Sequence, residues 1–137
     1  MSPHTNFLLS PKAGFTSSSP TVGIGYSTGA GSTVTQLTNR TTGVTINTIA
    51  GAITTNNASL AAEATADFVV TNSSVAIGDT VIVSIRSGSD SGGTIVSVAT
   101  VAAGSFTIRV HNGNAAAGTA ETGAIIINYA VIKAVSS

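Results

Sequence analysis

The chain has 137 residues and a mass of 13.4 kDa, which is enough for one small domain with a single hydrophobic core. Five basic residues balance five acidic ones, and charged residues make up only 7% of the chain, against about 25% in an average soluble domain. Nothing in this charge balance favours nucleic acid or an anionic membrane as a partner. Cysteine is absent, which excludes disulfides, thiolate metal sites and cysteine nucleophiles. A chain with zero net charge, few charged residues and few bulky residues indicates a subunit that gains stability by association.

The first 20 residues differ from the rest of the chain. All three prolines lie here, and residues 17–20 (Ser-Ser-Ser-Pro) are typical of an extended segment. Phe7-Leu8-Leu9 and Phe15 form apolar islands in this otherwise polar stretch. Two interpretations stay open: a flexible terminus, or an arm that docks its Phe and Leu side chains on a neighbouring subunit. The first residues lack a basic region followed by an apolar one, so no secretion signal is expected.

From residue 21 onward the chain has the pattern of β-strands. Thr, Val and Ile dominate, apolar and polar residues alternate, and turn residues separate the runs. The expected strands cover residues 32–36, 64–72, 79–87, 94–101, 105–110 and 124–135. Residues 56–66 could form a short helix, although a strand or a loop fits about as well. The longest apolar run, within 124–135, is too short for a membrane helix, which needs roughly 18 to 20 residues.

The alternation assigns an apolar face to each of the longer expected strands. These faces contain Ala66, Phe68, Val70, Val81, Val83, Ile85, Phe106, Ile108, Val110, Ile125, Ile127, Tyr129 and Val131. Several strands are apolar on their second face too, where Ile82, Ile126 and Ile132 are candidates for burial against another subunit. The alternative is a sheet that the chain's own loops partly cover. The sequence thus predicts an all-β fold: an antiparallel β-sandwich of jelly-roll or Greek-key type over 21–137, preceded by an extended arm over 1–20.

Motifs that carry chemistry are scarce. The glycine-rich run 22–31 lacks the spacing of a dinucleotide or phosphate loop and is expected to form a turn beside a strand. No Gly-x-Ser-x-Gly element occurs, and the five acids are scattered without ligand spacing. The two histidines are His4, in the arm, and His111, which precedes Asn-Gly and is expected beside a turn. We therefore expect no enzymatic activity, no cofactor and no metal.

Three arginines stand out because basic residues are so few. Arg40 lies among polar residues, and Arg86 and Arg109 fall in the middle of expected strands, opposite the apolar faces. One interpretation is that they solvate strand faces and discourage edge pairing. The other is that they pair with carboxylates across a subunit interface, a geometry that suits the planar guanidinium fork.

Several segments together resemble a family of small structural proteins of tailed bacteriophages and prophages. The resemblance is carried by Gly-Tyr-Ser-Thr-Gly-Ala-Gly-Ser-Thr-Val-Thr-Gln at 25–36, Asn-Arg-Thr-Thr-Gly-Val-Thr-Ile-Asn at 39–47, Gly-Ala-Ile-Thr at 51–54 and Asn-Tyr-Ala-Val-Ile-Lys-Ala at 128–134. It spans roughly residues 22–135 and leaves out the arm. It implies a virion protein similar to β-sandwich head decoration (cement) proteins, which commonly sit as trimers on the outer capsid. It implies no catalytic residues.

The composition and the resemblance lead to one functional hypothesis. The chain is expected to be a decoration protein that binds the outer capsid of a phage as trimers, with itself and the major capsid protein as partners and with assembly in the host bacterial cytoplasm. A module of a head or tail fibre that binds a host receptor or glycan is the alternative, and a bacterial surface or pilus-like subunit is a third. The expected contact residues are Phe7, Leu8, Leu9, Phe15, Arg40, Ile82, Ile126 and Ile132.

Overall fold

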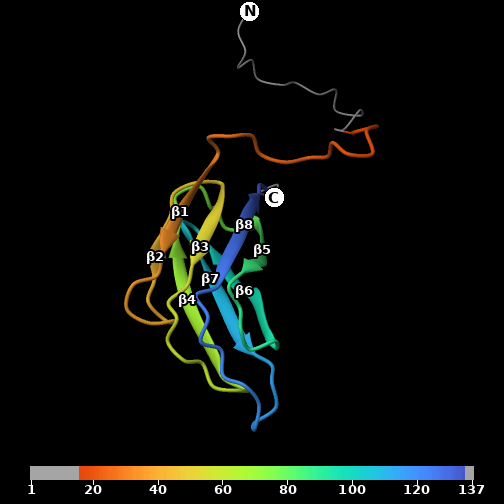
Figure 1. Cartoon of the computed structure of the whole chain (residues 1–137). Coiled ribbons are helices and arrows are strands. Elements are labelled where there is room, and N and C mark those ends of the chain that lie inside the picture. The colour runs from red at the N-terminus through yellow and green to blue at the C-terminus, as the bar shows by residue number, and fades with distance from the viewer. Residues whose placement is uncertain (1–15, 135–137) are drawn as a thin grey trace, which may run out of the picture.

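The protein is an all-β sandwich of two four-stranded sheets, as a computed structural model shows for residues 16–134 (Figure 1). The strands are β1 (Gly31–Thr35), β2 (Val44–Thr45), β3 (Ala50–Thr54), β4 (Thr65–Thr71), β5 (Thr80–Ser87), β6 (Thr94–Ala102), β7 (Ser105–Asn112) and β8 (Ile126–Ile132). One sheet has the order β1-β3-β8-β5 and the other the order β2-β4-β7-β6. The predicted fold class is confirmed. The described residues contain no helix long and apolar enough to cross a membrane.

The chain moves between the two sheets at almost every connection. Strands β1, β3, β5 and β8 belong to one layer, and only β6 and β7 follow each other within a layer, joined by a tight turn at Ala103 and Gly104. Between β1 and β3, and again between β2 and β4, the chain crosses to the opposite sheet and returns in the same direction. These two pairs are therefore parallel. The sheets are therefore mixed, whereas the sequence predicted antiparallel pairing throughout. The remaining pairs are antiparallel.

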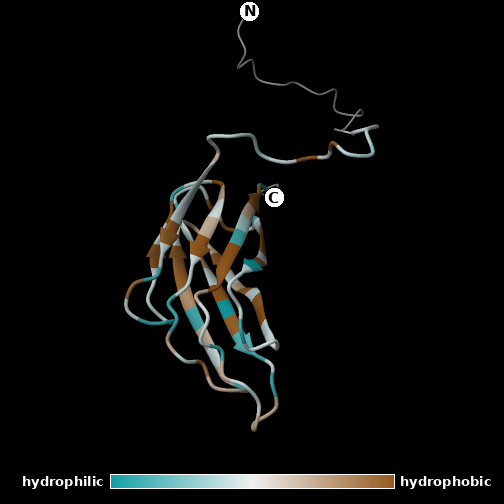
Figure 2. Cartoon of the chain, viewed as in Figure 1, coloured by the Kyte–Doolittle hydropathy of each residue, from teal (hydrophilic) through white to brown (hydrophobic). Residues whose placement is uncertain are grey.

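The core lies between the sheets and is built by the predicted alternation. The central strands β4, β7 and β8 each bury every second residue, and the hydrophobic colouring in Figure 2 is concentrated in the strands. Phe106 from one sheet meets Tyr129 from the other, with ring centroids 5.5 Å apart and a tilt of 50°. The largest fully buried apolar side chains are Phe68, Phe106, Ile53, Ile108, Ile125, Ile127, Val70, Val110 and Val131.

Some elements differ from the sequence prediction. Strands β2 and β3 were not predicted. For residues 56–64, where a helix, a strand and a loop were all left open, the structure has a loop that ends in a turn. Within this loop, the backbone of Leu60 forms an isolated antiparallel bridge with the backbone of Glu121, which is far away in the sequence. His111 lies inside β7 and not at a turn, and its Nδ1 lies 2.9 Å from the Thr65 hydroxyl of β4. Strand β7 runs two residues further than expected, because it keeps pairing with both β4 and β6.

The chain that leads into β1 runs outside the sandwich. Every residue from 16 to 29 is exposed, and the hydrogen bonds of Ser17, Ser19 and Thr21 are local to that stretch. In Figure 1 this red-to-orange segment leads away from the two sheets. The predicted anchors Phe7, Leu8, Leu9 and Phe15 lie outside the described residues.

Candidate functional site

The outer face of the β1-β3-β8-β5 sheet carries exposed isoleucines, and Arg86 of β5 is exposed on the same face. Ile82 of β5 lies opposite Ala130 of β8, and Ile132 is the diagonal neighbour two residues along. Both isoleucines are 51% exposed, because the alternation that turns Val81 and Val131 inward turns them outward. We call Ile82, Ala130 and Ile132 the isoleucine face.

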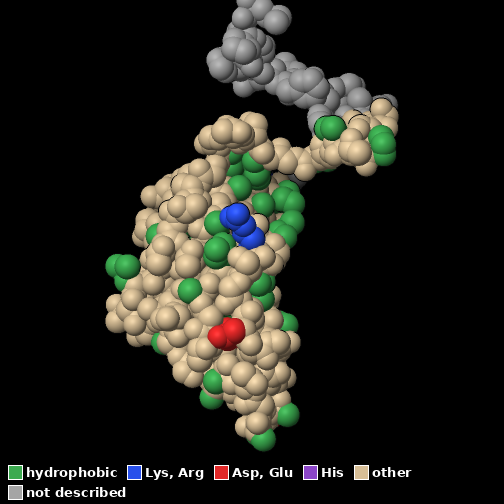
Figure 3. All heavy atoms as spheres, viewed as in Figure 1, with side chains coloured by type: hydrophobic (Ala, Val, Ile, Leu, Met, Phe, Trp, Pro, Cys, Tyr) green, Lys and Arg blue, Asp and Glu red, His purple; other side chains and the backbone are tan. Residues whose placement is uncertain are grey.

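The segment before β1 bends over this face and encloses a hollow. The Tyr26 hydroxyl donates a hydrogen bond to the carbonyl of Val131, which pins the segment to β8. The resulting hollow has a volume of about 460 Å³. It is lined by Ile24, Gly25, Tyr26, Ile82, Ala130, Ile132 and Lys133. Figure 3 shows hydrophobic side chains gathered around basic ones at the end of the molecule from which the arm leads away.

Lys133 contributes its aliphatic stem to the hollow and turns its charge aside. Its ammonium forms an ion pair with Asp79 and donates to the Ser74 carbonyl at 2.8 Å. The Asp79 side chain is 2% exposed, and the hydrogen bond from Lys133, followed by that from the Ala76 amide, lowers the pKa of its carboxyl. The charge of Lys133 is thus neutralised by its own chain. The side chains that line the hollow present mainly carbon atoms, which an apolar ligand could contact.

The outer face of the opposite sheet is polar. Arg109 of β7 and Asp67 of β4 form a bidentate pair, with Nε–Oδ1 and Nη2–Oδ2 distances of 2.9 and 2.7 Å. This pairing lowers the pKa of Asp67 and raises that of Arg109. The carboxylate partner that the sequence suggested for Arg109 on another subunit is therefore found in its own chain. Val69, 48% exposed, and Ile95, 59% exposed, are apolar residues on this face.

The flank formed by β5 and β6 is less covered than the rest of the core. Both are edge strands, and the inward-facing Val83, Ile85, Val96 and Val98 are only partly buried there. Strand β6 is nine residues long and carries neither a charge nor a proline, the features that usually protect an exposed edge. This edge is open to pairing with another strand.

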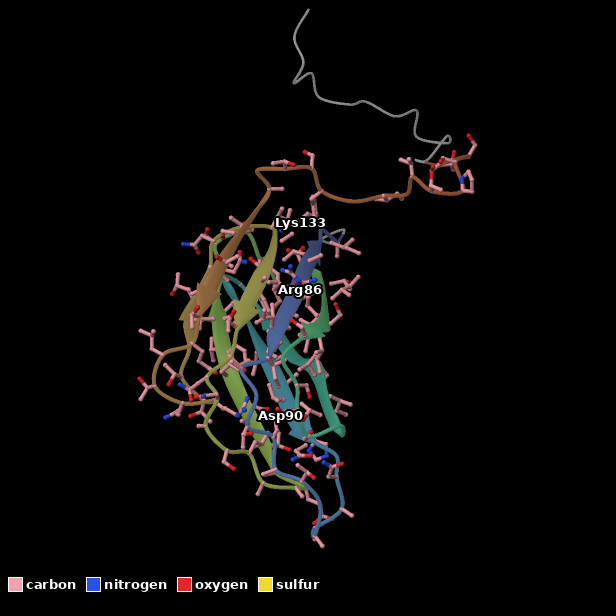
Figure 4. All side chains as sticks on the ribbon, in the orientation of Figure 1. Arg86, Asp90 and Lys133 are labelled. Atoms are coloured by element: carbon pink, nitrogen blue, oxygen red, sulfur yellow. The ribbon has the colours of Figure 1, made fainter. Side chains whose placement is uncertain are left out.

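Arg40 and Glu121 form a buried polar network beside the loop that holds Asp90, which Figure 4 shows toward the other end of the sandwich from Lys133. Arg40 is 4% exposed, and its guanidinium donates to the carbonyls of Ala58, Glu121 and Gly123. Burial lowers the pKa of Arg40, while the charge of Glu121 opposes that effect. Arg40 was predicted as a polar contact for a partner. This prediction is wrong, because the guanidinium is enclosed and already bonded to its own chain.

Glu121 is the acidic centre of this network, with no exposed surface. Its donors are Ser89 Oγ at 2.6 Å, Thr94 Oγ1 at 2.5 Å, and the amides of Gly123 at 2.9 Å, Asp90 at 3.0 Å and Ser91 at 3.4 Å. Burial alone would raise the pKa of Glu121, but the hydroxyl and amide donors outweigh it and hold the pKa far below its ordinary value. With both oxygens occupied, this carboxylate holds the 88–94 loop in place and has no free position for a substrate.

The predicted contact residues therefore separate into three groups. Ile82 and Ile132 lie together at the hollow, while Ile126 is on the same face but half-buried between Thr54 and Ser87. Arg40 is internal, and the four arm residues lie outside the described part of the chain. Sequence reasoning missed Ile24 and Tyr26, whose only signal was their alternation with glycine directly before the turn that opens β1.

Comparison with known proteins adds nothing to this geometry: no family model, no curated protein and no solved structure matches the chain. Within residues 16–134, no cluster of three or more His, Asp or Glu side chains is placed to hold a metal ion.

Proposed function

We propose that the chain is a non-enzymatic structural protein of a phage virion, a head decoration protein that binds the outer capsid as trimers and clamps neighbouring major capsid subunits. The observation that carries the proposal is the isoleucine face with its hollow. Covering a half-exposed isoleucine gains about 1 kcal/mol, so a face of this kind favours association when other contacts add to it. The resemblance of residues 22–135 to phage structural proteins supplies the kind of assembly.

The uneven surface of the sandwich supports this proposal. One outer face carries Ile82 and Ile132 at the hollow, with Arg86 exposed further along β5. The other carries the Asp67–Arg109 pair, so the hollow is the part of the two faces best suited to contact with protein. The uncharged edge of β6 adds a second surface for association. A trimer that bears three such faces holds a lattice more tightly than one copy, because every contact after the first is intramolecular.

The stoichiometry of the virion tests the proposal directly. Purified particles of the phage or induced prophage that encodes the chain are digested, and the chain is quantified by mass spectrometry against the major capsid protein. Hundreds of copies per particle are expected. A few to tens of copies would overturn the decoration role and favour the tail or fibre alternative, and complete absence from particles would overturn the virion proposal altogether.

A binding assay tests the role of the arm. Heads that lack the chain are mixed with the full-length protein or with a variant that lacks residues 2–19, and the bound protein is measured after sedimentation. We expect the truncated protein to stay folded, since residues 16–29 are exposed and outside the core, but to lose most of its binding to heads. Full occupancy by the truncated protein would show that the arm plays no part in decoration.

A further inference from the structure

We propose that the hollow is the receptor for the apolar run Phe7-Leu8-Leu9 of a second copy, so that neighbouring copies exchange arms. The inference rests on the self-association part of the proposed function and requires no capsid. It assigns Ile24, Ile82 and Ile132 as the residues that receive the arm.

The lining of the hollow fits an apolar peptide. Ile24 is 80% exposed, Ile82 and Ile132 are 51% exposed and Tyr26 is 47% exposed, so four large side chains present carbon to water in one place. At about 460 Å³ the hollow falls in the size range of sites that hold small ligands, which leaves room for more than one aliphatic or aromatic side chain. Lys133 is paired with Asp79 and the exposed Arg86 is not among the lining residues, so the lining holds no unpaired charge that must be desolvated when an apolar chain enters.

The arm contains the matching ligand. Phe7, Leu8 and Leu9 are the most apolar run among the first 20 residues, and Lys12 is the only Asp, Glu, Lys or Arg in that stretch. The residues around the run are mostly Ser, Thr, Pro and Asn, which do not compete for an apolar site. An uncharged ligand and a neutral hollow are therefore complementary in chemistry.

The length of the arm allows it to reach another copy. Sixteen positions separate Leu8 from Ile24, which bounds the span between them at about 53 Å if extended. A globule of this size is about 35 Å across. The described part of the arm leads away from its own sandwich (Figure 1), which points the residues before it toward a neighbour. The neighbour's hollow is therefore the better acceptor.

Cysteine cross-linking of the full chain tests this inference, and the natural absence of cysteine makes the readout clean. A Leu8→Cys variant is mixed with an Ile82→Cys variant under mild oxidation, and disulfide-linked peptides are identified by mass spectrometry. The matched control replaces Ile82→Cys with Val69→Cys, because Val69 is an equally exposed aliphatic residue on the opposite outer face. We expect at least tenfold more linkage from Leu8→Cys to position 82 than to position 69.

Two further variants make the outcome decisive. A chain carrying both Leu8→Cys and Ile82→Cys should give linked dimers and larger species; if it yields only internally linked monomers, the arm folds back and the exchange is refuted. Ile132→Ser in the acceptor should reduce linkage at position 82 at least fivefold. Equal linkage at positions 82 and 69 would also overturn the inference, whereas hundreds of copies per virion would still uphold the proposed function.

Discussion

The buried carboxylate of Glu121 offers the sharpest test of how this fold is held together. In Glu121→Gln, the amide oxygen can still accept from the backbone amides of Asp90 and Gly123, now without a charge. The amide nitrogen faces the hydroxyls of Ser89 and Thr94, which can rotate to accept from it. Hydrogen bonds to a charged group contribute about 1 kcal/mol more than neutral ones, and part of this loss is offset because no charge is buried. We expect the free energy of unfolding to fall by about 2 kcal/mol at pH 7.

The effect of pH distinguishes a lost charge from a general packing defect. The pKa of Glu121 is depressed in the folded protein, so its carboxylate contributes stability that is fully present above the unfolded pKa, near about 4.3. That contribution is lost as the pH falls toward the lower folded pKa. The difference between wild type and Glu121→Gln should therefore shrink by on the order of 1 to 2 kcal/mol between pH 7 and pH 3.

Urea unfolding followed by far-ultraviolet circular dichroism measures both quantities, at one fixed protein concentration because association adds to apparent stability. The exposed Glu63→Gln is the control and should stay within about 0.5 kcal/mol of wild type at both pH values. A Glu121→Gln variant as stable as wild type at pH 7, or one whose deficit is the same at pH 3, would refute the assigned role of the carboxylate.

Three further substitutions test local packing, hydrogen bonding and backbone strain by thermal and urea unfolding. Arg40→Met leaves buried carbonyls without their donor and should cost about 3 kcal/mol, while the exposed Arg86→Met should be nearly neutral; equal effects would contradict the internal role of Arg40. Gly123→Ala would place a Cβ 1.8 Å from a backbone oxygen and should cost at least about 3 kcal/mol or prevent folding, whereas Gly23→Ala meets nothing within 4 Å and should be silent. Glu63 has a φ of 65°, so Glu63→Gly should raise stability by up to about 1 kcal/mol, and a clear loss would be evidence against strain there.

The long strands could be predicted because their side chains alternate without interruption. In β4, Ala66, Phe68 and Val70 are buried while Thr65 and Val69 are exposed, as the period of two requires. The same pattern correctly placed the cores of β7 and β8. The local sequence is sufficient to predict these strands, because the alternation of apolar and polar residues within each strand shows which of its sides faces the core.

The short strands could not be predicted because their partners determine them. Strand β3 reads Ala-Gly-Ala-Ile-Thr, which has little β-propensity of its own. It is a strand because β1 and β8 hydrogen-bond to it on both sides. Gly51 is required there, since a Cβ would lie 2.6 Å from the Ser32 carbonyl oxygen of the parallel neighbour. Two-residue β2 likewise depends on its pairing with β4.

The sequence by itself determined the all-β fold, the inward faces of the main strands and the outward isoleucines, because all three follow from local alternation and composition. Tertiary structure alone decided that Ile24 and Tyr26 lie over β8, and that the Arg40 guanidinium reaches the carbonyl of Glu121, 81 positions away. Whether an exposed arginine or a buried one results depends on which loops meet at the end of the sandwich. Such a meeting arises from how two sheets are connected, and no short-range pattern in the chain encodes it.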